Sequence, residues 1–382
     1  MAKLRQKLTI LARKLRKNII SEEANLFVPQ SSQNDVVFLE DRHYKRKRIV
    51  LLSRGCTVGF CSMCPLPNES LDPTRRITEE ELISQFESAF LGDSIDNYEL
   101  ITIYNNGNFF FDNEIPAKVR HHIYGRMKKS KASLLVVESL PQFIDDQKIK
   151  EAKQTMGDKK LSVLIGLQSS NQIIREVLIN SPCTQFHFER AVELLVKNDY
   201  NASVFLMIKP PFLNEREAIE DAINSIEYVY GLGIKDIVLC PTRVAPGTVA
   251  YLLAQTGKFS PPRLWSILEI LRRSRQLDLG RINLPRVALS ELKKEKNKDS
   301  FCAENCNLCT EKIIKAIEKF NEKREFKALD SMACVCLSDY QKFLQEESTL
   351  WENKNFVERV ESFLGAVPGG VMERGESGFK ML

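Results

Sequence analysis

Residues 48–64 read RIVLLSRGCTVGFCSMC, a short apolar run followed at once by three cysteines. The run is rich in Val, Ile and Leu and apolar on both faces, as a buried parallel strand should be. Cys56, Cys61 and Cys64 follow it with the spacing C-x4-C-x2-C. Three thiolates leave one iron of a 4Fe–4S cube without a protein ligand, so the stretch predicts a reactive iron–sulfur site at the end of a strand.

The rest of the chain places this first strand, 48–53, in a parallel sheet. Apolar runs alternate with amphipathic helical patterns, as in α/β folds whose strands are joined by helices. The further runs predicted as strands are 100–105, 133–139, 161–167, 202–208 and 236–240. Six strand–helix units predict a partial (β/α)6 barrel, and barrel active sites lie on the loops after the carboxyl ends of the strands.

The pattern divides the chain into three predicted parts. Residues 1–47 form a basic N-terminal segment, residues 48–260 the barrel, and residues 261–382 a C-terminal appendage that carries a second group of cysteines. The appendage opens with a proline-started helix at 261–276, and one more strand is predicted within 281–290.

The composition is that of an ordinary globular protein, with 382 residues of which 43% are hydrophobic and 27% charged. No apolar run is long enough to cross a bilayer, and the basic N-terminus lacks the apolar core of a secretory signal. We therefore expect a cytoplasmic protein. Ten cysteines in that compartment indicate metal ligands rather than a disulfide framework.

Positive charge is concentrated in two segments, although the formal net charge is only +5. Residues 3–17 carry seven Lys and Arg without one acid, and residues 42–48 read RHYKRKR. Two basic segments beside a site would suit a polyanionic substrate such as RNA. A solvated basic helix and a basic lead-in to a strand are the alternative interpretation.

Three cysteines after the first strand of a β/α barrel resemble the radical S-adenosylmethionine (SAM) superfamily. That resemblance implies a 4Fe–4S cluster on Cys56, Cys61 and Cys64, SAM bound to its free iron, an external electron donor and a 5′-deoxyadenosyl radical. The first gap of four residues departs from the superfamily's usual three. A zinc site is the structural alternative, but zinc normally takes four protein ligands, and His43 stands on the far side of the strand.

The same resemblance makes the loops after the other strands the expected site of SAM and substrate. Met63 stands where the superfamily usually has an aromatic residue near the adenine, and the loop after the second strand often holds the SAM amino group. The candidate cofactor-binding residues are Met63, Asn106, Gly107, Glu138, Ser139, Gln168, Ser169, Arg175 and Lys209. A Ser or Asn at a strand end more often caps the following helix, which is the simpler interpretation of any one of them.

Several longer segments between residues 48 and 340 resemble the archaeosine-forming radical SAM family, and more distantly the tRNA-modifying Elp3-type barrels. The segments are IYNNGNFFFDNEIP, VVESLPQFI, IGLQSSNQIIREVLIN, KPPFLNEREAIEDAINSI and FSPPRLWSILEIL. Members of this family act on tRNA that carries a lysine adduct of a 7-deazaguanine base. They break a carbon–nitrogen bond of the adduct, so the resemblance implies a tRNA substrate and a lyase-type reaction.

The chain departs from that family at several strand ends. The family favours an arginine and a glutamate where this chain has Leu140 and Gln142, a glutamate at Gln168 and a tryptophan at Arg263. Loss of charged groups changes which groups of a substrate can be paired. The radical chemistry therefore transfers to this chain more directly than the archaeosine substrate does.

A second group of cysteines lies in the appendage. Two closely spaced pairs separated by a helix are a common zinc arrangement, and they predict one four-thiolate site on Cys306, Cys309, Cys334 and Cys336. An auxiliary iron–sulfur cluster is the rival, with Cys302 as a further possible ligand, because spacing alone does not choose the metal.

Three functions remain open from the sequence. The leading prediction is a radical SAM enzyme that modifies a tRNA base. The second keeps the radical chemistry but replaces tRNA with a small molecule or peptide, which the mild net charge and the altered strand ends favour. The third, of a different class, is a zinc-stabilised RNA-binding protein without catalysis, in which both cysteine groups are structural.

Overall fold

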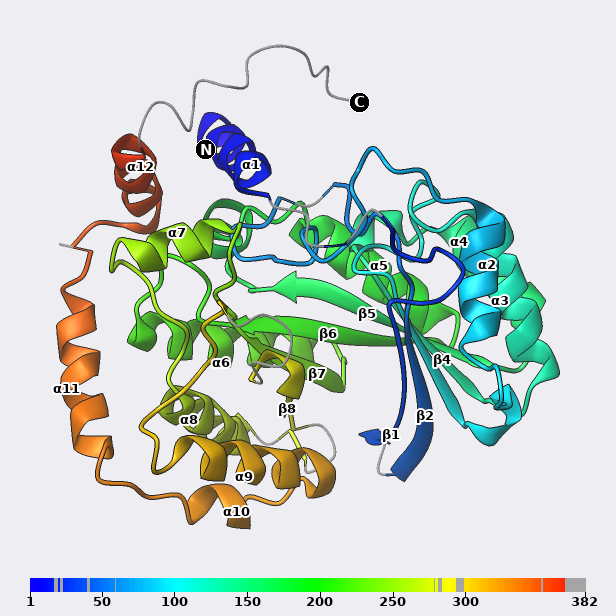
Figure 1. Cartoon of the computed structure of the whole chain (residues 1–382). Coiled ribbons are helices and arrows are strands. Elements are labelled where there is room, and N and C mark those ends of the chain that lie inside the picture. The colour runs from blue at the N-terminus through cyan, green and yellow to red at the C-terminus, as the bar shows by residue number, and fades with distance from the viewer. Residues whose placement is uncertain are drawn as a thin grey trace.

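The computed structural model describes residues 1–16, 20, 23–39, 42–58, 60–277, 279–280, 284–292, 299–351 and 353–367. Its centre is one curled sheet of eight strands that lie side by side in chain order (Figure 1). The strands are β1 (Ser31–Leu39), β2 (Arg42–Val50), β3 (Leu100–Tyr104), β4 (Leu134–Ser139), β5 (Lys160–Gln168), β6 (Asn201–Ile208), β7 (Asp236–Pro241) and β8 (Arg286–Val287).

The sheet is an open half-barrel rather than a closed ring. Strands β2 to β8 run parallel, while β1 pairs antiparallel with β2 as an edge strand. The six predicted strands correspond to β2–β7, so the prediction of a partial (β/α)6 barrel is confirmed.

The start of the sheet differs from the prediction. The first parallel strand is β2, over 42–50 rather than 48–53, and the preceding strand β1 was not predicted. The basic run is therefore part of the sheet, and its charges are matched across the hairpin by polar residues of β1. Arg46 donates two hydrogen bonds to the carboxylate of Asp35, one of them 2.7 Å long. The strand predicted within 281–290 is only the two-residue β8, and residues 281–283 lie outside the described residues.

Helices join the parallel strands, and most of them pack against one another along the outside of the sheet (Figure 1). They are α2 (Glu79–Ser88), α3 (Ala117–Lys129), α4 (Asp146–Met156), α5 (Gln185–Lys197), α6 (Glu215–Gly231), α7 (Val249–Gln255) and α8 (Leu264–Ser274). The acids of the predicted helix starts are used in capping boxes. Thr78 and Glu81 close one at α2, and Asn214 and Glu217 close another at α6.

The remaining helices are α1 (Ala2–Leu15), α9 (Thr310–Lys323), α10 (Lys327–Asp330), α11 (Leu337–Ser348) and α12 (Phe356–Ala366). Helix α9 contacts both edges of the sheet, β1 and β8. Its Asn321 side chain accepts the backbone N–H of Val287 at 3.0 Å and donates to the carbonyl of Val287 at 2.8 Å. The amide thereby pairs with the edge strand as a neighbouring strand would, which protects that edge.

Two apolar cores hold these layers together. The larger lies between the sheet and its helices and continues into the C-terminal region through Ile317, Phe320 and Tyr340. The second joins α1 to η3 (Ile174–Leu178), α7 and α12. The larger core contains residues from both sides of residue 260, where the barrel was predicted to end. The division of the chain at that residue stays a prediction. None of the described helices is long and apolar enough to cross a membrane.

Candidate active site

The first cysteine group lies on the long loop between β2 and α2, where the backbone is pinned on three sides. The N–H of Cys56 donates to the carbonyl of Asn106 at 2.8 Å, and that of Ser62 donates to Ile179 at 2.7 Å. The carbonyl of Ser62 accepts the N–H of Ala250 in α7 at 2.9 Å. Gly55 has φ +63°, and a Cβ there would lie 2.2 Å from Oγ of Ser70, so this turn requires glycine. Gly59, the other glycine of this loop, lies outside the described residues.

The three thiols are half-buried, and the surroundings of Cys61 and Cys64 oppose ionisation when no metal is bound. Burial, reinforced by the neighbouring thiols, raises the pKa of Cys61, and burial raises the pKa of Cys64 to about 12. The guanidinium of Arg16 lies close enough to favour the thiolate form of both. A positively charged metal centre would supply the remaining stabilisation, because thiolates are the form that binds metals.

The geometry separates the two cysteine groups. In the described part of the chain, only the four C-terminal cysteines gather three or more His, Cys, Asp or Glu ligand atoms tightly enough for a single metal ion. Cys56, Cys61 and Cys64 do not form such a group. Three ligands that are not gathered around one point fit a polynuclear cluster, whose irons each take a different thiolate, better than they fit one zinc ion.

Cys64 opens onto a cavity of about 770 Å³ at the carboxyl ends of the strands. Tyr104, Gln168 and Pro241, which end β3, β5 and β7, all line it. The predicted site residues that line this cavity are Met63, Cys64, Asn106, Glu138 and Gln168. Residues predicted at the ends of different strands therefore meet around one space next to Cys64.

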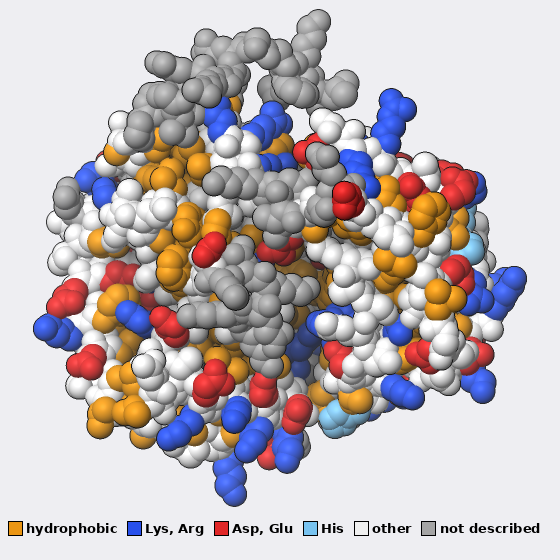
Figure 2. Space-filling model, in the orientation of Figure 1, with side chains coloured by type: hydrophobic (Ala, Val, Ile, Leu, Met, Phe, Trp, Pro, Cys, Tyr) orange, Lys and Arg blue, Asp and Glu red, His pale blue; other side chains and the backbone are white. Residues whose placement is uncertain are grey.

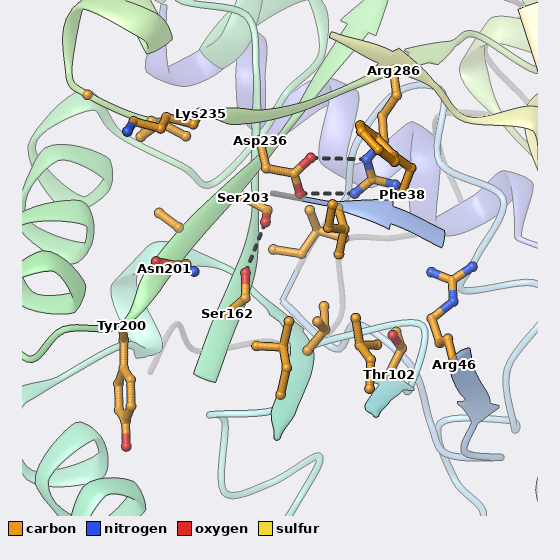
Figure 3. Close-up of a pocket in the computed structure, with 18 of the residues that line it drawn as sticks. Phe38, Arg46, Thr102, Ser162, Tyr200, Asn201, Ser203, Lys235, Asp236 and Arg286 are labelled. Carbon is orange, nitrogen blue, oxygen red and sulfur yellow. Dashed lines mark hydrogen bonds and ion pairs between the residues drawn. The ribbon is translucent and has the colours of Figure 1, made fainter. Parts of the chain in front are cut away.

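A smaller cavity of about 380 Å³ occupies the amino ends of the same strands (Figure 3). The small polar residues Thr102, Ser162 and Ser203 line it together with Leu100, Leu134 and Val136. The bidentate ion pair of Asp236 and Arg286, with both N···O distances 3.0 Å, crosses one side. Arg286 also lines the larger cavity, so the two spaces adjoin and the interior of the half-barrel is hollow along the strands.

The loop after β3 is anchored by a carboxylate at the end of β4. Glu138 accepts the N–H of Asn105 at 3.0 Å and that of Gly107 at 3.3 Å. Burial raises the pKa of Glu138 to about 7, against the effect of these hydrogen bonds. The side-chain amide of Asn106 donates to Gln30 at 3.1 Å. Glu138 therefore holds the loop that the superfamily resemblance associates with the SAM amino group.

Three residues at the carboxyl ends of the strands have unusual backbone conformations, and two of them, Asn106 and Gln168, line the larger cavity. Asn106, Gln168 and Lys209, which end or follow β3, β5 and β6, have φ angles of 54°, 71° and 59°. Left-handed conformations cost energy for residues other than glycine and gather at functional sites. These three conformations therefore mark the carboxyl end of the sheet, where the first cysteine group also lies, as the functional end.

The other predicted cofactor-binding residues are held by contacts within the protein. Ser169 donates to Asp221 on α6 at 2.6 Å, and Arg175 donates to the carbonyls of Ser169 and Cys183. The ammonium of Lys209 is fully buried between two carboxylates. Ser139 is buried, and its hydroxyl has no hydrogen-bond partner among the described residues. Those four side chains are not part of the wall of the larger cavity.

Helix α1 covers the cysteine loop, a role that the sequence did not reveal. The guanidinium carbons of Arg13 and Arg16 lie 4.1 Å and 4.8 Å from the ring centroid of Phe60, next to Cys61. Asn180 links the two segments, because its amide donates to Thr9 of α1 at 3.0 Å and to the carbonyl of Phe60 at 3.1 Å. Only the absence of acids in residues 3–17 hinted at a role beside a site.

The two basic segments differ in what their charges contact. In β2, Arg46 pairs with Asp35 and Lys47 with Asp93, so that segment is largely neutralised within the protein. In α1, Lys3 and Lys7 are exposed, and residue 17 lies outside the described residues. Figure 2 shows basic and acidic side chains interspersed over most of one face of the molecule.

The four C-terminal cysteines come together as their spacing predicts. Their sulfur atoms lie 3.6 Å apart for Cys306 and Cys309, 3.5 Å for Cys306 and Cys334, and 3.6 Å for Cys309 and Cys336. All four lie within 4.8 Å of one another. Cys302 is buried outside this group. The site therefore consists of four thiols around one point, without Cys302.

Comparisons with known proteins find sequence relatives over most of the chain. No family model matches the chain. An uncharacterized protein of Methanocaldococcus jannaschii is 29% identical over 82% of this chain and 84% of its own length. Two proteins named archaeosine synthase subunit beta are 26% and 25% identical, one from Methanosarcina acetivorans and one from Thermococcus kodakarensis. They align with 79% and 80% of this chain, and with 86% and 93% of their own lengths.

Solved structures are similar at a lower level. The archaeal Elp3 of Methanocaldococcus infernus has a TM-score of 0.45 and 16% identity, over 63% of this chain and 59% of that one. The radical SAM methyltransferase TsrM of Kitasatospora setae has a TM-score of 0.40 and 14% identity, over 55% and 37%. At these scores, the function of the site rests on the chain's own residues and on its sequence relatives.

Proposed function

We propose that this chain, a radical SAM enzyme, modifies a base of tRNA by breaking a carbon–nitrogen bond in a lysine adduct of 7-deazaguanine. Two observations together carry the proposal. Three cysteines lie beside the cavity of the half-barrel, and relatives named archaeosine synthase subunit beta align with about four fifths of the chain. Archaeosine formation is the reaction that the sequence resemblance independently implies.

The residues suit the cofactors of this reaction. Cys56, Cys61 and Cys64 would hold a 4Fe–4S cluster, and the loop after β3, fixed by Glu138, would receive SAM together with Met63. Bound in this way, the two cofactors supply one-electron cleavage of the sulfonium and a 5′-deoxyadenosyl radical. The residues of the chain bind and orient: Glu138 accepts hydrogen bonds from the backbone N–H groups of Asn105 and Gly107 and so holds this loop in place.

The shape of the interior supports an extended substrate. A base turned out of its helix enters a pocket at a cost of a few kcal/mol. The two adjoining cavities leave room beyond it for a long aliphatic adduct that ends in charged groups. Side chains of both signs, including the pair of Asp236 and Arg286, line that deeper part.

The proposal is tested with the full chain, reconstituted anaerobically and given SAM, dithionite and adduct-bearing tRNA. We expect 5′-deoxyadenosine together with a mass change at the modified base, and neither product from Cys61→Ala. Cys183→Ala, which removes a buried thiol of the large core, is the matched control. A reconstituted enzyme that cleaves SAM but never changes the tRNA would overturn the substrate and leave the radical chemistry standing.

A second candidate is radical chemistry on a small molecule or peptide. It is favoured by Gln168, which lines the larger cavity where the resembled family has a glutamate, and by the internal pairing of the basic residues of β2. Turnover of a free small-molecule adduct, with no retention of tRNA at low salt, would support it. The relatives named archaeosine synthase subunit beta favour an enzyme over a purely structural RNA-binding protein.

The C-terminal cysteines are proposed to hold one zinc ion. Tetrahedral zinc with Zn–S bonds of about 2.3 Å separates its thiolates by roughly 3.8 Å, close to the spacing of the four sulfurs here. A 4Fe–4S cube spreads its four thiolates over four irons and needs wider spacing. The distances therefore favour zinc over an auxiliary cluster.

A further inference from the structure

The side chain of Asn108 is held in a single orientation beside Cys56. Asn108 is 1% exposed, and its Oδ1 accepts the backbone N–H of Leu140 at 2.8 Å. A backbone N–H can only donate, so the amide oxygen must face Leu140 and the NH₂ group must face the opposite way. On that side Nδ2 lies 3.6 Å from Sγ of Cys56, within hydrogen-bonding distance for sulfur.

The carboxylate of Glu114 also holds the same NH₂ group in place. This carboxylate is buried and accepts Nδ2 of Asn108 at 3.0 Å and 3.1 Å. It also accepts the backbone N–H of Thr57 at 2.8 Å and the hydroxyl of Thr57 at 3.0 Å. One carboxylate thus binds the residue that follows Cys56 and the amide that reaches its sulfur.

The loop geometry is built around this contact. A Cβ on Gly107 would lie 2.4 Å from Oε2 of Glu114 and 2.9 Å from the backbone nitrogen of Cys56. Only glycine therefore lets the loop after β3 approach the cysteine loop closely enough for Asn108 to reach Cys56. Both loops and Glu114 must be in place for the hydrogen bond to form.

Hydrogen bonds to cluster thiolates are one of the means by which a protein sets a cluster's reduction potential. The reduced cluster carries one more negative charge than the oxidised cluster, so an N–H donor at a ligating sulfur stabilises the reduced form. We propose that Asn108 raises the reduction potential of the cluster through Cys56, and that Glu114 is a positioning residue that holds the amide. The inference rests on the proposed function only in taking Cys56 as a cluster ligand.

The experiment is a redox titration, followed by electron paramagnetic resonance, of the anaerobically reconstituted full chain. Asn108→Leu removes the donor at similar volume, and we expect a lower midpoint potential at unchanged iron and sulfide content. Glu114→Gln should lower the potential by less, because the loosened hydrogen bond is partly offset by the loss of a buried carboxylate beside the cluster. Asn113→Leu, at an exposed position of the same loop, is the matched control and should not change the potential.

A second measurement needs no variant. Wild-type protein labelled with ¹⁵N only at the asparagine side chain should show a hyperfine coupling of that nitrogen to the reduced cluster, and Asn108→Leu should lack it. A loaded Asn108→Leu cluster with the wild-type potential, or a wild-type cluster without this coupling, overturns the inference alone. A wild-type chain that takes up no iron would overturn the inference together with the proposed function, so the two failures are distinct.

Discussion

The ammonium of Lys209 lies 2.6 Å from a carboxylate oxygen of Glu347, joining the end of β6 to α11 across 138 residues of sequence. It lies 2.7 Å from Glu215, whose own N–H donates to Glu347 at 2.6 Å. Although burial alone would lower it, the two carboxylates raise the pKa of Lys209. The three charges therefore form one buried ionic cluster that fastens the C-terminal helices to the half-barrel.

Lys209→Met is expected to destabilise the protein strongly. The variant leaves two buried carboxylates without their cation, and breaking a buried ion pair in this way costs about 3 to 5 kcal/mol. Urea unfolding followed by circular dichroism measures the change. Lys197→Met, at an exposed position at the end of α5, is the control and should change stability by less than about 0.5 kcal/mol. A loss equal to that of the control would show that the cluster does not contribute to stability.

The four-thiolate site is expected to bind one zinc ion independently of iron. Elemental analysis of chain purified anaerobically, before iron is added, should give one zinc per chain. Cys309→Ser should lose the metal and lower the unfolding midpoint, because the metal-binding free energy is also folding free energy. Cys302→Ser is the control, since Cys302 is buried outside the group, and it should keep the zinc. Iron in place of zinc in the purified chain would contradict the assignment.

Glu138 is expected to make stability depend on pH near neutrality. Its pKa is raised to about 7 in the fold from about 4.5 in the unfolded chain, so the folded state binds more protons between those values and loses stability as pH rises through them. The loss between pH 6 and pH 8 should be about 1 kcal/mol. Glu138→Gln should remove it, so this variant gains stability relative to wild type as pH rises.

The measurement for Glu138 is a series of urea unfolding curves at pH 6, 7 and 8 for both proteins. Glu193→Gln, at an exposed position of α5, serves as the control and should follow wild type at every pH. Parallel curves for Glu138→Gln and wild type would mean that the carboxyl does not titrate in this range.

Helix α1 is expected to protect the cluster from air. Arg13 and Arg16 both lie over the ring of Phe60 beside Cys61, so Arg16→Gln should loosen that cover and accelerate the loss of cluster absorbance in aerated buffer severalfold. Lys7→Gln changes an exposed charge of the same helix and should leave the rate unchanged. Equal rates for all three proteins would assign the protection to another part of the chain.

The sequence predicted the parts of the fold that depend on local pattern. Strands β3 to β7 are apolar runs that need no partner to be recognised. Strand β1 reads SSQNDVVFL and most of β2 reads as a basic segment, and neither has the composition of a buried strand. The register of these two strands depends on pairs such as Arg46 with Asp35. Neither segment has a pattern of hydrophobic residues from which such a pair could be predicted.

The candidate site was predictable to the extent that it depends on spacing. The cysteines and the strand-end residues Asn106, Glu138 and Gln168 could be named because parallel strands end on one side of a sheet. The contact of Asn108 with Cys56 spans 52 residues, and that of Lys209 with Glu347 spans 138. Such contacts follow from how whole elements pack, so a polar residue at a strand end could equally face the cavity or a buried partner.

The packing of α1 has a consequence for how the protein is made. Leu4, Leu8 and Leu11 of α1 share one apolar core with Val360 and Phe363 of α12, so α1 is synthesised long before a helix against which it packs. The cover over Phe60 and Cys61 is therefore complete only after α12 has been translated. Until then the cysteine loop lacks part of its cover, which leaves an interval in which a metal centre could reach it.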